Sequence, residues 1–156
     1  MNERTTLKKI ISGGQTGADL AGIEAAQYCG ILTGGTAPKR WRVCNPDGSD
    51  GSNPLLAAYG LTEHSSREYK PRTIKNVLDS DGTVWYGFED SPGGKLTLST
   101  AKKSGKPAIV NPSTEQLRSW VAENQIQTLN VAGNRESSFN PNIYREVYDA
   151  ICEAFY

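Results

Sequence analysis

Residues 7–19 join a short apolar stretch to a glycine-rich turn, and the turn leads into a helical pattern. The turn reads Gly13-Gly14-Gln15-Thr16-Gly17, and glycine lets the backbone come close to a ligand because it has no Cβ. The first amides of the following helix lack partners within the helix and attract negative charge. Strand, turn and helix together predict a site for a phosphate or a similar anion.

Two known phosphate-binding motifs do not fit this turn. It lacks the Gly-Lys-Ser/Thr of a Walker loop, and its glycines do not follow the G-x-G-x-x-G spacing of dinucleotide-binding proteins. A tight connection that uses glycine only for its geometry remains an alternative. The polar side chains of Gln15, Thr16 and Asp19 favour a binding site, because a plain turn does not need them.

Two more turns follow apolar strands further along the chain. Gly93 and Gly94 precede a helix that carries Thr97, and Gly133 begins a segment with Asn134, Arg135 and Ser137. The planar guanidinium of Arg135 suits a phosphate, although an ion pair with a neighbouring glutamate is the alternative interpretation. We expect the three turns to meet, because the carboxyl ends of parallel strands lie at one edge of a sheet.

The elements that must position these turns alternate between strand and helix. Apolar and β-branched patterns predict strands at 7–11, 30–35, 83–88, 108–110 and 126–131, and helices at 17–29, 72–78, 95–104, 112–121 and 141–156. Ser113 is the expected N-cap of the fourth helix. The pattern predicts an α/β fold of three layers, with a mainly parallel sheet of five or slightly more strands between helices.

The chain of 156 residues is expected to form a single domain, 1–156, with a long loop insertion at about 36–71. This stretch has little apolar periodicity, and we expect it to cover the site or to contact another subunit. Its basic run includes Lys39, which either faces solvent or supplies an anion contact from the covering loop.

The charge balance and the cysteine pattern exclude several classes of protein. With 17 basic and 17 acidic residues the net charge is zero, so we predict neither a nucleic-acid nor a membrane partner. The three cysteines form no C-x-x-C pair, which favours reduced thiols over a zinc site. The polar segment 1–6 lacks a signal-peptide core, and the expected location is cytoplasmic.

No catalytic constellation emerges from the residue types. His64 is the single histidine, and no Ser-His-Asp set can be assembled around it. Binding is therefore favoured over catalysis, and the question of an enzyme stays open. One alternative is a nucleotide-processing enzyme with Asp19 or Glu136 as the general base, and another is a nucleotide-sensing module.

Several motifs together resemble the molybdenum carrier family. They are the turn at 13–19, Gly-Gly-Thr-Ala-Pro-Lys at 34–39, Arg-Thr-Ile-Lys-Asn-Val at 72–77, Asp-Ser-Asp-Gly-Thr at 79–83 and Val-Ala-Gly-Asn-Arg-Glu-Ser at 131–137. The resemblance implies a Rossmann-like protein that binds the molybdenum cofactor (molybdopterin) and protects it without altering it. It also implies a cytosolic homo-oligomer, with a tetramer favoured, that passes the cofactor to molybdenum enzymes; no metal ligated by the protein itself is expected.

The same family is similar to the lonely-guy phosphoribohydrolases, which carry a Pro-Gly-Gly-x-Gly-Thr turn and a catalytic glutamate. Here Pro92, Gly93, Gly94 and Thr97 are present without the glutamate, which favours phosphate binding over hydrolysis. Asn134 stands where the carrier family has proline. Molybdate, tungstate or a nucleotide stays open as the ligand. The expected contacts are Gly13, Gly14, Gln15, Thr16, Gly17, Asp19, Lys39, Gly93, Gly94, Thr97, Gly133, Asn134, Arg135 and Ser137.

Overall fold

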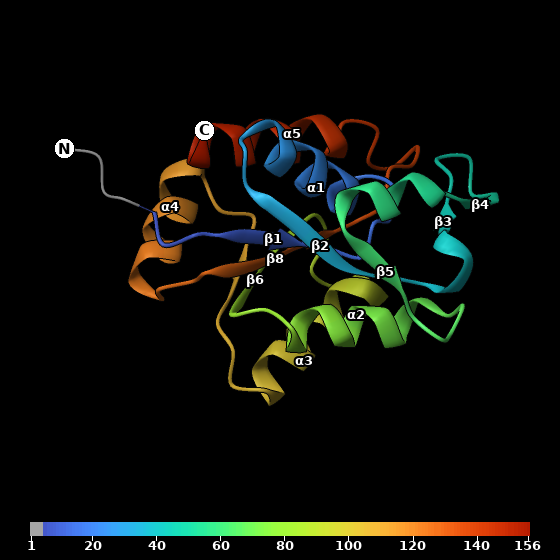
Figure 1. Cartoon of the computed structure of the whole chain (residues 1–156), viewed down its shortest axis with the longest axis horizontal. Helices are drawn as coiled ribbons and strands as arrows, with labels where there is room; N and C mark the ends of the chain where they lie inside the picture. Colours follow the sequence, from blue (N-terminus) through green and yellow to red (C-terminus); the bar gives the residue numbers. More distant parts are fainter. Residues whose placement is uncertain (1–4) are drawn as a thin grey trace.

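The computed structural model describes residues 5–156, so the first four residues of the polar N-terminal segment lie outside it. A six-stranded parallel sheet forms its centre (Figure 1). In spatial order the strands are β5 (Leu61–Glu63), β2 (Leu32–Ala37), β1 (Lys9–Ile11), β8 (Thr128–Gly133), β6 (Gly82–Tyr86) and β7 (Ala108–Val110). In the middle of the sheet, Ile10 pairs with Thr33 on one side and with Leu129 on the other.

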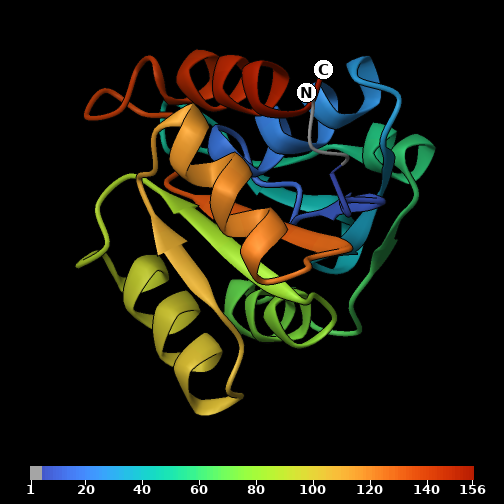
Figure 2. The same ribbon diagram turned by 90° about the vertical axis from the view of Figure 1, so that its left-hand side faces the viewer.

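Helices cover both faces of the sheet, as the alternating pattern predicts. Helices α1 (Ala18–Tyr28) and α5 (Ile143–Phe155) pack together on one face, and α4 (Thr114–Glu123) packs against α5. Helices α2 (Tyr69–Leu78) and α3 (Pro92–Lys103) pack together on the other face (Figures 1 and 2). The expected three-layer α/β sandwich is confirmed. Within residues 5–156, no helix combines the length and apolar character of a bilayer span.

Local sequence signals explain why these helices form where they do. In α5, Ile143, Val147 and Ile151 recur at helical spacing, and all three are buried in the hydrophobic core. At the start of α4, the hydroxyl of Ser113 accepts the amide of Gln116, whose side chain accepts the Ser113 amide in return. The predicted N-cap is thus confirmed as a capping box.

The region 36–71 contains more regular structure than the expected loop. Strands β3 (Arg42–Cys44) and β4 (Asp50–Ser52) form an antiparallel hairpin, and β5 joins the central sheet beside β2. Two 3₁₀ helices complete the region, η1 (Lys39–Trp41) and η2 (Pro54–Tyr59). Each of these strands has three residues, which is too short for a periodic pattern to reveal. The sixth strand of the sheet comes from this region.

Two helices begin three residues earlier than predicted, and proline explains both. Helix α2 begins at Tyr69 instead of residue 72, because Pro71 is tolerated in a first helical turn, where amides lack partners. Helix α3 begins at Pro92 instead of residue 95, and the hydroxyl of Ser91 caps it by accepting the Gly94 amide. The turn with Gly93 and Gly94 is therefore the first turn of α3.

The order of the strands decides where the turns gather. From β1 the chain moves outward through β2 to β5, whereas β8, the last strand, returns to the other side of β1. The winding direction reverses at this pair, and ligands of parallel sheets bind beyond the carboxyl ends of strands at such a position. The turns after β1, β6 and β8 share that edge.

Candidate functional site

A small cavity of about 60 Å³ lies at this edge of the sheet. It is bounded by the ends of β1, β6 and β8, the first turns of α1 and α3, and one face of α2. The lining residues are mostly small or polar: Gly13, Asp19, Arg72, Thr73, Asn76, Trp85, Gly93, Thr97, Asn130, Ala132 and Gly133.

A buried ion pair forms one wall of the cavity. Asp19, in the first turn of α1, accepts a hydrogen bond from Nη1 of Arg72 at 3.1 Å. The Asp19 and Arg72 side chains are only 5% and 11% exposed. The carboxylate also accepts the backbone amides of Gln15 and Gly133. The protein therefore places its own negative charge where the sequence predicts a bound anion.

Burial raises the pKa of Asp19 above its usual value of 3.8, although Arg72 and the amides of Gln15 and Gly133 act in the opposite direction. The folded protein therefore keeps this proton at pH values above 3.8, at which the unfolded chain has released it. Because the folded state then binds more protons, the contribution of Asp19 to stability falls as pH rises.

Asp19→Asn, which cannot titrate, is expected to gain stability relative to the natural protein as pH rises from about 4 to 7. Urea unfolding at several pH values measures the difference in unfolding free energy. Asp149→Asn, at an exposed carboxylate, controls for the removal of one negative charge. A difference that stays constant with pH would contradict the raised pKa of Asp19.

Two buried N–H groups at the cavity have no partner among residues 5–156: Nε of Arg72 and Nε1 of Trp85. Both residues line the cavity, and Trp85 is only 2% exposed. Thr97, another buried lining residue, carries a hydroxyl that can donate a further hydrogen bond. Buried donors in native proteins are almost always paired, so this excess of donors indicates a place for an acceptor.

The guanidinium of Arg72 lies between the backbone of Gly13 and the ring of Tyr69. Its guanidinium lies against the backbone of Gly13, where any Cβ would collide with it. On its other side the guanidinium carbon lies 5.5 Å from the centre of the Tyr69 ring, one helical turn earlier. Gly13 is therefore needed to admit a cation from α2.

Gly14, Gln15 and Thr16 of the predicted glycine turn contact the core and the β3–β4 hairpin instead of the cavity. A Cβ on Gly14 would meet the Leu56 side chain, so this residue faces the core. Oε1 of Gln15 accepts the amide of Cys44 at 2.7 Å, and the hydroxyl of Thr16 donates to the Cys44 carbonyl at 2.6 Å. These two side chains hold the β3–β4 hairpin against the turn and do not line the cavity.

Gly17, Gly133 and Asn134 join two of the predicted turns directly. The carbonyl of Asn134 accepts the amide of Ala18 at 3.2 Å, which occupies one donor of the α1 terminus. Gly17 packs against the backbone of residues 134–136, and Gly133 lines the cavity. The Asn134 side chain accepts the Phe88 amide and donates to Ser91, so it clamps the end of β8 to that of β6.

The remaining predicted contacts divide between the cavity and its surroundings. Gly93 and Thr97 line the cavity, whereas the buried Gly94 packs against the Glu89 carbonyl. Arg135 points away, toward the Asn45 carbonyl at 3.4 Å, and it forms no ion pair with a described carboxylate. Ser137 accepts the amide of Phe139 within its own turn.

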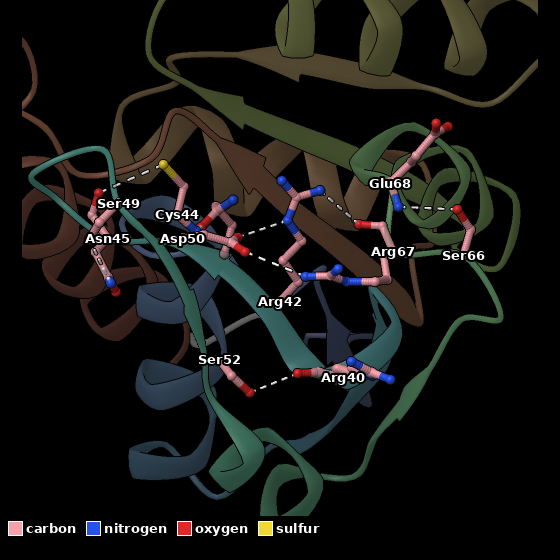
Figure 3. A network of polar contacts seen from close by, with 11 residues as sticks. Arg40, Arg42, Cys44, Asn45, Ser49, Asp50, Ser52, Ser66, Arg67 and Glu68 are labelled. Atoms are coloured by element: carbon pink, nitrogen blue, oxygen red, sulfur yellow. Dashed lines mark hydrogen bonds and ion pairs between the residues drawn. The ribbon is translucent and has the colours of Figure 1, made fainter.

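A polar network stabilises the hairpin beside the site (Figure 3). Arg42 pairs with Asp50 at 2.8 Å and donates to the Arg67 carbonyl at 3.1 Å. The Arg42 guanidinium also lies 4.7 Å from the centre of the Tyr69 ring, which Arg72 contacts as well. Lys39 is exposed and joins this region through its backbone amide, which donates to the Ser66 carbonyl. The hairpin thus contacts the site through Tyr69.

A second and much larger hollow, of about 610 Å³, lies on the surface between α1 and the start of α5. Glu136 lines this groove, not the cavity, so the two acidic residues proposed as general bases lie at different places. The smaller cavity is the better candidate site despite its size, because it holds the ion pair and the unpartnered donors.

Six residues that line the cavity were not among the contacts predicted from the sequence: Arg72, Thr73, Asn76, Trp85, Asn130 and Ala132. Asn76 exchanges two hydrogen bonds of 2.9 Å with the backbone of Thr36, which holds α2 against β2. Arg72 and Asn76 are one helical turn apart, and Asn130 interrupts an apolar strand. These signals were available, but nothing in the sequence alone placed α2 beside the other turns.

Comparison with known proteins agrees with this architecture. A family model described as the circularly permutated YpsA SLOG family matches residues 10–155. The chain belongs to this family. No curated protein sequence matches the chain.

A crystal structure named "Putative molybdenum carrier protein", from Syntrophus aciditrophicus SB, resembles this SLOG-family chain over nearly all of its length. The two sequences are 36% identical, the TM-score is 0.83, and the alignment covers 98% of this chain and 97% of that one. The resemblance to the molybdenum carrier family is thereby confirmed. A structure of (E)-4-hydroxy-3-methyl-but-2-enyl diphosphate reductase aligns with a TM-score of 0.39 and 10% identity over 94% of this chain and 59% of that one, which is too distant to bear on function.

Proposed function

We propose that the protein binds an anionic, phosphorylated small molecule through the cavity at the ends of β1, β6 and β8, and that it acts as a carrier. The observation that carries this proposal is the pair of unpartnered donors on Arg72 and Trp85. An oxyanion offers acceptors to both N–H groups, to the Thr97 hydroxyl and to the first turn of α3. Asp19 accepts a hydrogen bond from Nη1 of Arg72 but leaves Nε of Arg72 without a partner among residues 5–156, so the guanidinium can still bind an anion through Nε.

The size of the cavity indicates how much of the ligand it takes. A volume of about 60 Å³ is roughly that of two water molecules, which suits one phosphate-sized group. The remainder of a larger molecule would lie outside, where the region 36–71 and Arg135 border the site. In this proposal Gly93, Gly133 and Thr97 contact the anionic group, while Gln15, Thr16 and Asn134 hold the surrounding loops.

The molybdenum cofactor is the ligand that we propose, because the related crystal structure is named a molybdenum carrier protein. Its pterin bears a phosphate, which would occupy the cavity. We further propose that the protein holds the cofactor unchanged, as a cytoplasmic homo-oligomer that passes it to molybdenum enzymes. Glu136 lies outside the cavity and Asp19 is buried in an ion pair with Arg72, which favours a carrier over a nucleotide-processing enzyme.

The direct experiment is mass spectrometry of the small molecules released from the purified protein, with metal analysis alongside. A pterin phosphate with molybdenum supports the full proposal. A nucleotide with no molybdenum would replace the cofactor by another phosphorylated ligand of the same cavity. Protein that releases no anion, and that binds neither inorganic phosphate nor molybdate, would contradict the proposal.

Trp85→Phe tests the donor most specifically, since it removes the indole N–H and keeps an aromatic ring. We expect phosphate or molybdate affinity, measured by calorimetry, to fall about 10- to 100-fold, as for the loss of one hydrogen bond to a charged group. Stability should change little, because the N–H has no partner in the protein. Trp120→Phe, in α4, is the matched control and should bind normally. Equal affinity in both variants would remove Trp85 from the site.

A further inference from the structure

Two of the three cysteines meet where α1 ends beside the last turns of α5. Cys29 is the C-terminal cap of α1, and Cys152 lies near the end of α5. Their sulfur atoms are 3.8 Å apart, although the residues are 123 positions apart in sequence. Close packing of α1 against α5 produces this meeting.

Aromatic packing holds the two helix ends in register around the sulfur atoms. Tyr28, which precedes Cys29, lies 6.4 Å from Tyr148, one helical turn before Cys152. Tyr28 also stacks on Tyr156 with the ring centres 5.5 Å apart. The cysteines therefore face each other because of the surrounding packing, and not through a chance orientation of two exposed side chains.

The two thiols differ in their hydrogen-bonding roles. The S–H of Cys29 donates to the sulfur of Cys152, and burial, together with this neighbour, raises the pKa of Cys29 to about 12. Cys29 thus holds its proton toward the neighbouring sulfur. Both residues are half-buried, so a small oxidant can reach them from solvent.

Cys44 provides an internal comparison. It is also half-buried, but it lies in the β3–β4 hairpin, and its S–H donates to the Asn45 carbonyl at 3.7 Å. No second thiol stands beside it among residues 5–156. Oxidation of Cys44 can therefore not end in an intramolecular disulfide in this fold.

We infer that Cys29 and Cys152 form a site of reversible oxidation, at which a hydroperoxide such as hydrogen peroxide converts the two thiols into a disulfide joining α1 to α5. This inference does not depend on the proposed ligand. Formation of the bond needs the sulfur atoms to approach from 3.8 Å to about 2 Å.

The reaction balances in two steps. The Cys152 thiolate attacks one peroxide oxygen, the O–O bond breaks, and the products are a sulfenic acid and hydroxide, which takes up the proton lost by the thiol. The Cys29 sulfur then attacks the sulfenic sulfur, and hydroxide leaves with the Cys29 proton as water. Overall, two thiols and one hydrogen peroxide give one disulfide and two waters, so the sulfurs are oxidised and the peroxide is reduced.

The disulfide is expected to stabilise the fold, because it closes a long loop of the unfolded chain between two helices already in contact. A loop of this length should raise the melting temperature by roughly 10–20 °C. A thiol reductant should return it to the starting value.

The test uses the full chain with Cys44→Ser, so that only the pair can react. After mild peroxide treatment, we expect monomer lighter by two hydrogen atoms, without alkylatable thiols, with one peptide linking Cys29 to Cys152 and with a raised melting temperature. Chains that also carry Cys29→Ser should stop at sulfenic or sulfinic acid without the rise in melting temperature. Two free thiols after treatment, higher oxidation without the linked peptide, or disulfide-bonded dimers would overturn the inference.

Discussion

Arg72→Ala should abolish anion binding and should also lower the free energy of unfolding by about 3–5 kcal/mol, as does removal of one partner from a buried ion pair. The substitution takes away the free Nε donor and leaves Asp19 buried without its cation. Calorimetric titration with phosphate or molybdate measures the first effect, and urea unfolding measures the second.

A second variant separates binding from stability. Arg72→Met combined with Asp19→Asn removes both charges and keeps much of the side-chain volume, so the fold should recover most of the lost free energy. Anion binding should remain absent, because neither the cation nor its Nε donor is restored. Normal phosphate or molybdate binding by this folded double variant would exclude Arg72 from the site.

Gly17→Ala is expected to be the most destabilising substitution of a glycine at the site, by roughly 3 kcal/mol or more. Gly17 has a φ of 88°, in a region that favours glycine, and a Cβ would lie 2.5 Å from the Glu136 nitrogen and 2.7 Å from the Asn134 oxygen. Both are backbone atoms, so they cannot rotate away. Thermal and urea unfolding measure the loss.

Gly30→Ala is the matched control for this prediction. Gly30 also has a positive φ, of 72°, but nothing lies within 4 Å of its Cβ position. Its substitution should cost only the conformational penalty, about 1 kcal/mol. If the two variants lost the same stability, the contact between α1 and the segment after β8 would not be the cause.

Much of the fold was predictable because its signals are local. Ser113 and Gln116 form the capping box expected of a helix start, and Ile143, Val147 and Ile151 are buried as their spacing indicates. Alternation of strands with amphipathic helices is enough to predict a parallel sheet with helices on both faces. The β3–β4 hairpin and β5 escaped prediction, because strands of three residues carry no pattern and are stabilised by their partners.

The candidate site was predictable only in part. The glycine turns do meet at one edge of the sheet, and Gly13, Asp19, Gly93, Thr97 and Gly133 line the cavity there. The direction of each side chain was beyond sequence patterns. Arg135 turns toward the hairpin, and the Asn134 carbonyl occupies an amide at the start of α1 that was expected to face a ligand.

The layered α/β architecture and the edge of the sheet at which polar turns gather follow from the sequence alone, because propensity, capping and apolar periodicity act over a few neighbouring residues. The folded structure is needed to see that the cation of the site is Arg72 from α2, that Asp19 pairs with it, and that two donors have no partner among residues 5–156. Those features depend on contacts between residues distant in the chain, and packing and burial set such contacts only once the whole sheet has formed.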